Sequence, residues 1–245
     1  MTQRFFAIEF LEDAFSVWFL HELMQMQSYL RARPRARLVV SNFTAACAAS
    51  DEESREGLRL WREFCAGESH PPAELPLRLA DYVDAVSGEL RVLDESIPLA
   101  QVCLLDLKAA EPLRATDGTH FRLFLFGGIL GDNPPRGRTD VLLPHFPHRR
   151  HLLQRQLATD TAVLVTSIVV NDGRELTEVP FLDEPELASA EDPGSTVAMT
   201  GFSYVSDRYD PVTGHVAPPG GPEAPLMSPA VRELLFLDFD AALLG

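Results

Sequence analysis

The stretch FRLFLFGGILGDNPPRGR, residues 121–138, decides the fold of this chain. Its apolar and aromatic run from Phe121 to Phe126 has the length and composition of a buried strand. Gly127 and Gly128 end the run, and adjacent glycines let the backbone approach a ligand closely because no Cβ stands in the way. In open α/β sheets, ligands bind at the carboxyl ends of the strands. The stretch therefore predicts either a ligand-binding loop or a tight turn that requires glycine.

Strands and helices are predicted on the amino-terminal side of this stretch. Short apolar runs predict strands over residues 5–9, 37–41 and 102–105. A helix is expected from Leu11 to a point before Pro34, and a second helix over residues 52–64. The residues at helical spacing in the first helix are Phe15, Trp18, Phe19, Glu22, Leu23 and Met26. Its aromatic and methionine side chains are expected to belong to the core.

The carboxyl-terminal half contains one ambiguous segment and two predicted loops. Residues 157–170 are rich in β-branched residues, which favour a strand, but Thr159, Asp160 and Thr161 are good N-cap residues, so we expect a buried helix. Residues 67–76 and 210–229 are rich in proline and predict exposed loops. Ser228 followed by Pro229 predicts the start of a final helix that ends near residues 236–238.

The charge of the chain restricts its partners. At 245 residues it is long enough to bury a substantial core, and its formal net charge is -15. Nucleic-acid affinity depends on the neutralisation of phosphates by Lys and Arg, so this balance disfavours a nucleic-acid partner and favours a cationic one. A local basic patch around Arg149, Arg150 and Arg155 is the exception that the sequence leaves open.

The cysteines and the apolar runs indicate the compartment. Cys47, Cys65 and Cys103 are scattered and form no CxxC pair, which suits a reducing compartment and predicts a cytoplasmic protein. No uncharged apolar run approaches the roughly 20 residues of a membrane span, so no membrane association is expected.

A metal site is not expected. Histidines recur at positions 145, 148 and 151, but Pro144 and Pro147 disrupt any helical face there. No companion cysteine or acidic cluster completes a ligand set.

Four segments together resemble one known family. They are AIEFLEDAFSVWFLHEL (residues 7–23), VCLLDLKA (102–109), FGGILGDNPPRGRT (126–139) and LATDTAV (157–163). In this order they resemble the protein-arginine methyltransferase branch of the SPOUT superfamily, and the resemblance spans most of the chain. It implies one SPOUT-like methyltransferase domain over residues 1–245. The implied fold is α/β, with a mainly parallel sheet flanked by helices and a C-terminal deep trefoil knot, a rare exception to the rule that chains avoid knots.

The resemblance also implies a pocket for S-adenosylmethionine, with S-adenosylhomocysteine as the product. Three loops, residues 104–108, 126–132 and 152–162, would build this pocket. The implied cofactor-binding residues are Leu104, Leu105, Asp106, Phe126, Gly127, Gly128, Ile129, Leu130, Gly131, Leu152, Leu157, Thr159, Thr161 and Ala162. The segment RRHLLQRQ, residues 149–156, lacks the glycine that the resemblance implies near Leu153.

Carboxylates are the candidate catalytic groups. Methyl transfer from a sulfonium requires positioning and charge complementarity, and carboxylates bind a guanidinium bidentately and orient the attacked nitrogen. Asp132 in the glycine loop is the first candidate, and its alternative role is turn formation before Asn133 and Pro134. Glu9, at the end of the first predicted strand, and Asp160 are the other two.

Three functions remain open on the sequence. The first is methylation of an arginine in a basic protein, with a ribosomal protein as the substrate class that the resemblance implies. In that case we expect a monomer with no direct nucleic-acid contact. The second is an RNA methyltransferase, which requires a basic surface around residues 149–155 large enough to overcome the charge of -15. The third is a cofactor-binding protein without catalytic activity.

Overall fold

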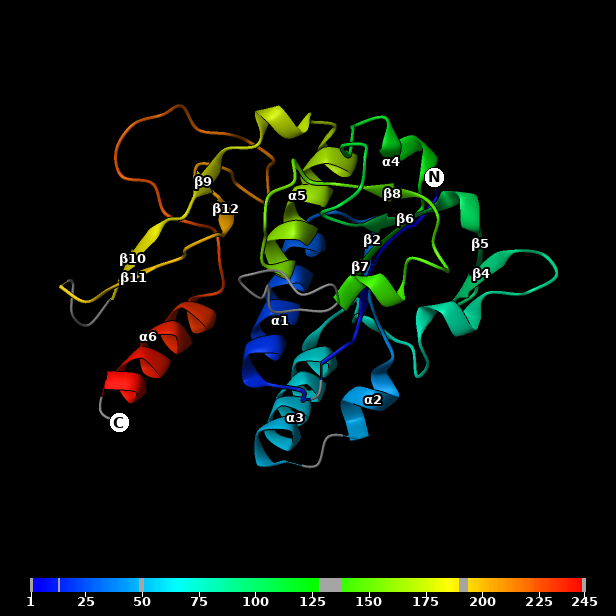
Figure 1. Ribbon diagram of the computed structural model, residues 1–245, viewed down its shortest axis with the longest axis horizontal. Helices are drawn as coiled ribbons and strands as arrows, with labels where there is room; N and C mark the ends of the chain where they lie inside the picture. Colours follow the sequence, from blue (N-terminus) through cyan, green and yellow to red (C-terminus); the bar gives the residue numbers. More distant parts are fainter. Residues whose placement is uncertain (1, 13, 49–50, 128–137, 190–193, 244–245) are drawn as a thin grey trace.

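A six-stranded parallel sheet forms the centre of the computed structural model, which describes residues 2–12, 14–48, 51–127, 138–189 and 194–243 (Figure 1). The strands stand in the order β3-β2-β1-β7-β6-β8, and every neighbouring pair is parallel. Their bounds are β1 Arg4–Glu9, β2 Ala36–Ser41, β3 Ala73–Glu74, β6 Val102–Leu105, β7 Leu123–Gly127 and β8 Arg149–Arg150. The predicted α/β class, with a mainly parallel sheet flanked by helices, is confirmed. The knot stays a prediction.

Strand β1 supplies both faces of the sheet with core residues. It pairs with β2 on one side, where Ala7 stands opposite Val39, and with β7 on the other, where Ala7 stands opposite Leu125. Phe6 and Ile8 pack into the core on one face, whereas Phe5 and Ala7 pack into the core on the other. A strand buried on both faces is typical of a parallel sheet in an α/β protein.

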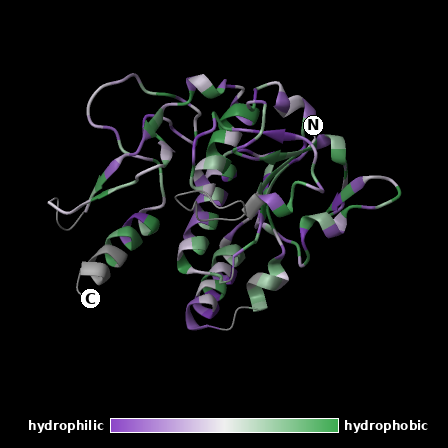
Figure 2. Cartoon of the chain, viewed as in Figure 1, coloured by the Kyte–Doolittle hydropathy of each residue, from purple (hydrophilic) through white to green (hydrophobic). Residues whose placement is uncertain are grey.

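Long helices cover one face of the sheet, and short elements cover the other. The first face carries α1 Val17–Arg31, α3 Glu52–Gly67 and α5 Thr159–Asp172. Figure 2 shows α5 as mainly hydrophobic, in agreement with its burial, whereas hydrophilic residues interrupt α3. The second face carries the 3₁₀ turn Leu79–Tyr82, the hairpin of β4 Glu89–Val92 with β5 Glu95–Pro98, and the residues around the 3₁₀ turn Arg138–Val141. Two short helices, α2 Phe43–Ala48 and α4 Asp117–His120, lie at the ends of strands.

The carboxyl-terminal part packs beside α1 and α5. It contains β9 Phe181–Asp183 paired with β12 Ser203–Val205, β10 Glu186–Ala188 paired with β11 Thr196–Ala198, and α6 Pro229–Leu243 (Figure 1). A partly buried ion pair anchors it: Arg33 donates to both carboxylate oxygens of Asp172 at 2.8 Å and to the Tyr209 hydroxyl at 2.9 Å. Because Tyr209 is only 1% exposed, this network fixes the segment after β12 to the ends of α1 and α5.

The strands and helices predicted from the sequence are found, with shifted ends. The first helix begins at Val17 and not at Leu11, because the Ser16 hydroxyl caps it by accepting the Phe19 N–H at 3.1 Å. Phe10 and Phe15 precede the helix and pack their rings against Phe19. The helix predicted over residues 157–170 is confirmed as α5, although Ala158 occupies its N-cap and residues 159–161 form its first turn.

The structure also changes the bounds predicted for one loop and for the final helix. The prediction of an exposed loop over residues 67–76 was wrong in part, because Ala73–Glu74 pair with β2 and bury Ala73 and Leu75. Residues 210–229 form no regular element before α6 begins at Pro229, which confirms a loop, and α6 continues beyond the predicted end to Leu243.

Across the residues that the structure describes, no helix is long and apolar enough to cross a membrane.

Gly57 on α3 provides a test of the packing between this helix and the residues that precede α1. A Cβ at Gly57 would lie 2.7 Å from the carbonyl oxygen of Phe15 and 3.1 Å from its ring, whereas a Cβ at Gly67 in the same helix would meet nothing within 4 Å. We therefore expect Gly57→Ala to lower the free energy of unfolding by about 1–3 kcal/mol. Gly67→Ala should be neutral or stabilising by up to about 1 kcal/mol. Chemical denaturation of both variants measures the difference, and equal effects would contradict the packing described.

Candidate functional site

The three predicted cofactor loops all begin at the carboxyl ends of strands in the sheet. Asp106 follows the last residue of β6, Gly127 ends β7, and Leu152 follows β8. These three strands are parallel neighbours, so their carboxyl ends meet at one edge. Gly128, Ile129, Leu130, Gly131 and Asp132 lie outside the described residues, and their predicted roles stay predictions.

Apolar side chains from these loops converge on the helical face of the sheet. Phe126 is 3% exposed and Leu152 is 7% exposed, and both belong to the core shared with α1 and α5. The predicted residues Leu105, Leu157 and Ala162 are partly buried against the same core. Leu104 is the exception among the predicted apolar residues, because its side chain packs into the core on the opposite face.

Asp106 holds two of the loops together. One of its carboxylate oxygens accepts from Arg149 at 2.9 Å, and the other accepts the Lys108 backbone N–H at 3.0 Å. Its own N–H donates to the Arg150 carbonyl at 2.9 Å. These bonds fix the turn after β6 to the end of β8.

Glu9 lies on the face of the sheet opposite to Asp160. Its side chain accepts from the Ser41 hydroxyl and from the Leu79 backbone N–H, the latter at 3.0 Å. Burial raises the pKa of the Glu9 carboxyl, and the hydrogen bonds from Ser41 and Leu79 oppose that shift. The structure therefore separates two of the three predicted catalytic carboxylates.

Asp160 has a different acidic neighbour, Glu22 on α1. Both carboxyl groups are almost fully buried, with Glu22 2% and Asp160 3% exposed. The Glu22 carboxylate accepts from the Trp18 indole N–H at 2.9 Å, while its other oxygen has no hydrogen-bond partner among the described residues. The Asp160 carboxylate accepts the Thr161 backbone N–H within the first turn of α5. Packing of α1 against α5 thus places two carboxyl groups at one buried position.

The charges of the two carboxyl groups act on each other. Burial raises the pKa of Asp160 to about 6. Burial and the nearby charge of Asp160 raise the pKa of Glu22 well above its ordinary value, while interactions with Trp18 and the Asp160 backbone N–H lower it. Two carboxylates held together out of water favour either a proton or a bound cation, because each charge destabilises the other.

Two tyrosines complete this acidic cluster. Tyr29 on α1 and Tyr204 on β12 are each 3% exposed, and burial together with the charges of Asp160 and Glu22 raises the pKa of both phenols. The Tyr29 hydroxyl and the Thr166 hydroxyl lack hydrogen-bond partners among the described residues. Such unpaired buried polar atoms are rare in folded proteins and occur where a water or a ligand binds.

Sequence reasoning placed Glu22 in the core stripe of the first helix and did not assign it a catalytic role. The signal was present, because Glu22 shares that stripe with Phe19, Leu23 and Met26, and a fully buried carboxylate is rare without a partner. The identity of the partner could not be read from the sequence, since Asp160 is 138 residues distant along the chain.

The loop that leads to α5 is strained where the sequence lacks the expected glycine. Leu153 has φ 58° and Gln154 has φ 53°, both in the left-handed region that favours glycine. A non-glycine residue there costs roughly 1–2 kcal/mol, and such strain gathers at ligand-binding sites. The glycine that the resemblance implies near Leu153 would therefore fit the left-handed backbone of this loop without strain.

The basic patch that the RNA hypothesis requires is neutralised. Arg149 pairs with Asp106 at 2.9 Å. Arg150 pairs with Asp117 at 3.0 Å and with Glu111 at 3.3 Å. Arg155 pairs with Asp183 and stacks 4.7 Å from the Phe181 ring centroid. Each of the three arginines thus has a carboxylate partner.

No metal centre is seen in the described part of the chain, where no three His, Cys, Asp or Glu side chains cluster suitably. His151 uses its Nδ1 to accept the Gln154 backbone N–H at 3.2 Å. The expected absence of a metal stays a prediction.

Comparisons with known proteins show the family of this chain. A family model described as protein arginine N-methyltransferase SFM1-like matches residues 5–241. The protein arginine N-methyltransferase SFM1 of Saccharomyces cerevisiae is 31% identical over 209 residues, which cover 83% of this chain and 86% of the yeast protein. The chain belongs to the SFM1-like family of protein arginine N-methyltransferases.

Solved structures of this family share the fold. The crystal structure of the yeast arginine methyltransferase SFM1 complexed with SAM is 26% identical, with a TM-score of 0.67 over 97% of this chain and 92% of the yeast chain. The same enzyme complexed with SAH is 26% identical, with a TM-score of 0.67 over 95% of this chain and 94% of that one. The resemblance stated from the sequence motifs is therefore confirmed.

Asp160 should make the stability of this SFM1-like protein depend on pH. Its folded pKa of about 6 lies above the ordinary value of 3.8, so the folded state holds a proton that the unfolded state has lost. The free energy of unfolding should fall as pH rises from about 4 to about 6, by up to about 3 kcal/mol. Asp160→Asn should flatten this dependence and stabilise the protein at pH 7. Denaturation across pH 4–8 tests this, with the exposed Asp94→Asn as control, and an unchanged pH profile for Asp160→Asn would contradict it.

The strain before α5 gives a second prediction. Gln154 is exposed, so Gln154→Gly removes no packing and relieves the left-handed backbone. We expect it to raise the free energy of unfolding by about 0.5–1 kcal/mol, which is the relief of strain less the added entropy of the unfolded chain. Gln154→Ala, which keeps the Cβ, should give no gain. Thermal and chemical denaturation compare the two variants, and equal stability would refute the strain.

Proposed function

We propose that this protein is an S-adenosylmethionine-dependent methyltransferase that transfers a methyl group to an arginine side chain of a protein. The observation that carries the proposal is the buried pair of Glu22 and Asp160 beside the carboxyl edge of the sheet. A guanidinium stays protonated in proteins and presents a planar fork that matches carboxylates. An arginine side chain is thus the substrate group that best neutralises the two buried carboxylates.

The residues at the sheet edge fit the cofactor. Gly127 ends β7 without a Cβ, and Phe126, Leu152 and Leu157 supply an apolar wall on the face that carries α1 and α5. Small-molecule sites are mostly apolar with a few placed polar groups, and Thr159 and Thr161 are the polar groups nearest to this wall along the chain. The cofactor supplies an electrophilic methyl group on a sulfonium. The yeast relative was crystallised with SAM and with SAH.

The carboxylates perform two tasks in this proposal. Together they bind and orient the guanidinium, so that one nitrogen presents its lone pair to the methyl carbon. As the new carbon–nitrogen bond forms and the carbon–sulfur bond breaks, the attacked nitrogen becomes more acidic and loses a proton. Glu22 is the acceptor that we assign, because its second oxygen has no other partner among the described residues and its raised pKa favours the proton.

The substrate that we propose is a basic protein, with a ribosomal protein as the class implied by the family resemblance. The formal net charge of -15 supports a cationic partner. The pairing of Arg149, Arg150 and Arg155 with carboxylates favours protein over RNA, because it leaves these arginines less able to neutralise phosphates. A cytoplasmic monomer completes the proposal, and the unpaired state of all three cysteines supports a reducing compartment.

A transfer assay tests the proposed function directly. The protein is incubated with S-adenosylmethionine labelled in its methyl group and a ribosome-containing extract, and the products are digested with nuclease or with protease. Label that survives nuclease, is released by protease and hydrolyses to methylarginine supports the proposal. Label released by nuclease would make the protein an RNA methyltransferase, and absence of both label and S-adenosylhomocysteine binding would make it inactive.

Glu22→Gln separates catalysis from cofactor binding. It preserves the shape of the side chain and its hydrogen bond to Trp18 while it removes the charge, so we expect kcat to fall by about 100-fold or more. The affinity for S-adenosylhomocysteine should stay within about threefold, because Glu22 lies outside the three loops that we assign to the cofactor. Glu63→Gln, on the exposed side of α3, is the matched control and should be fully active. Full activity of Glu22→Gln would remove Glu22 from the mechanism.

A further inference from the structure

Tyr29 carries a buried hydroxyl that the proposed mechanism does not use. Its side chain is 3% exposed, and the hydroxyl has no hydrogen-bond partner among the described residues. A buried hydroxyl without a partner costs free energy, because folding removes it from water and returns no bond. The phenol oxygen is therefore an unused acceptor inside the protein.

Tyr29 lies on the same face of α1 as Glu22. Seven residues are close to two full turns of an α-helix, so positions 22 and 29 lie one above the other, about 10 Å apart along the axis. Aromatic side chains in helices extend back over the preceding turn. The Gln25 side chain on that turn interacts with the phenol, although no hydrogen bond of normal geometry forms. The Tyr29 hydroxyl thus reaches back along α1 toward Glu22.

Helices α1 and α5 run side by side in the same direction. Glu22 and Asp160 meet near the start of α5, whereas Arg33 pairs with Asp172 at its end. Arg33 is 11 residues after Glu22 and Asp172 is 12 residues after Asp160, so nearly equal lengths of chain separate the two contacts. Tyr29 lies between these contacts, in the core that both helices share.

The charges of the two carboxyl groups reach Tyr29. Burial raises the pKa of its phenol, and the charges of Asp160 and Glu22 raise it further. The phenol therefore stays protonated at neutral pH, and its oxygen is a neutral acceptor for an N–H donor. Tyr29 adds an uncharged oxygen beside two acidic side chains.

The same face of α1 leads toward the surface at Trp18. Trp18 lies one turn before Glu22, is only partly buried, and donates its indole N–H to the Glu22 carboxylate at 2.9 Å. Glu22 is 2% exposed, so this face runs from a partly exposed indole to buried polar groups. An arginine side chain has the length and the planar cationic end for such a path, and it stacks well on an aromatic ring.

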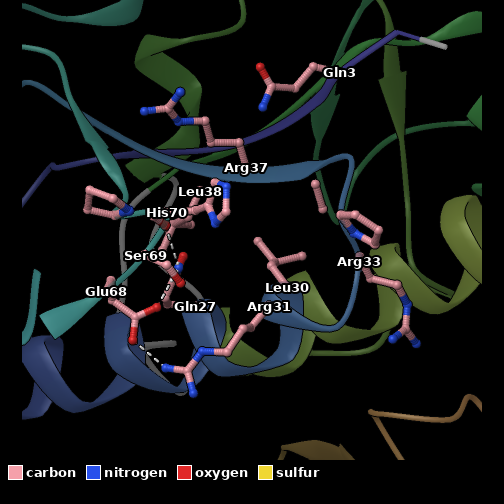
Figure 3. A pocket seen from close by; sticks show the side chains of 13 residues that line it. Gln3, Gln27, Leu30, Arg31, Arg33, Arg37, Leu38, Glu68, Ser69 and His70 are labelled. Atoms are coloured by element: carbon pink, nitrogen blue, oxygen red, sulfur yellow. Dashed lines mark hydrogen bonds and ion pairs between the residues drawn. The ribbon is translucent and has the colours of Figure 1, made fainter.

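The opposite end of α1 offers no comparable site. A cavity of about 380 Å³ lies there, and Gln27, Arg31 and Glu68 belong to its lining (Figure 3). Glu68 is the only carboxylate among the described residues that line it, and it already pairs with Arg31 and accepts from the Gln27 amide at 3.2 Å. A substrate arginine would therefore find no free carboxylate in this cavity.

We propose that Tyr29 is a third substrate-binding residue of the arginine site, an inference that rests on the proposed function. The Glu22 and Asp160 carboxylates neutralise the guanidinium, and the Tyr29 hydroxyl accepts an N–H from the side that faces away from the attacked nitrogen. A guanidinium has five N–H donors in one plane, so two carboxylates leave a donor for a further oxygen. The contact favours arginine over lysine, because a compact ammonium does not span the carboxylates and the hydroxyl.

Tyr29→Phe tests this contact, since it removes the hydroxyl and keeps the ring. We expect kcat/KM for methyl transfer, measured over a series of concentrations of the ribosome-containing extract, to fall at least about tenfold. The affinity for S-adenosylhomocysteine, measured by calorimetry, should stay unchanged. The melting temperature should not fall, because the lost hydroxyl makes no hydrogen bond in the free protein. Unchanged transfer would overturn the proposal, and so would a lower melting temperature together with weaker S-adenosylhomocysteine binding, which would make the role of Tyr29 structural.

Tyr82→Phe is the matched control. Tyr82 packs on the opposite face of the sheet, where its hydroxyl accepts the Leu77 backbone N–H at 3.2 Å. This variant removes the same atom and should transfer methyl groups as the unmodified protein does, so an equal loss in both variants would overturn the assignment to Tyr29. Absence of methylarginine with the unmodified protein would reject the proposed function and this inference with it. Normal transfer by both the unmodified protein and folded Tyr29→Phe would reject the contact alone.

Discussion

The parallel pairing of β1 between β2 and β7 is the constraint on which the rest of the structure depends. It buries β1 on both faces, so Phe6 and Ile8 require helices on one side while Phe5 and Ala7 require cover on the other. It also places the carboxyl end of β7 near the carboxyl ends of β6 and β8. The layers and the location of the cofactor loops are both consequences of this strand order, because parallel strands place their ends together.

The site is costly to the fold because it holds two carboxyl groups in the core. Glu22 and Asp160 come from different helices, and their raised pKa values record the loss of water and their mutual repulsion. A structure that maximised stability would place apolar side chains there. Retention of the pair is understandable if a substrate cation compensates it, and the strained backbone at Leu153 and Gln154 next to the same helix fits that interpretation.

The two edges of the sheet have opposite electrostatic character, and this matters more than the net charge. Buried acids gather near the carboxyl ends of the strands. At the amino ends, Arg4 donates only to uncharged acceptors, and Arg35 and Arg37 make no ion pair within the described residues. The arginines that the sequence singled out, Arg149 and Arg155 among them, are each matched by a carboxylate. The sequence alone does not show which arginines have a carboxylate partner, because the partners are distant along the chain.

The sequence by itself determined the strands, the main helices and the glycine-ended β7, because apolar periodicity and glycine act over a few neighbouring residues. With the resemblance that its motifs carry, it also determined the family and Asp160 as a candidate. Only the tertiary structure decided that Asp160 faces Glu22 and that Glu9 lies on the other face of the sheet. Local pattern assigned Glu22 to a helix face, but the packing of α1 on α5 selected its partner. Contacts between elements far apart in the chain are set by the shape of the whole core, and no short stretch of sequence contains that information.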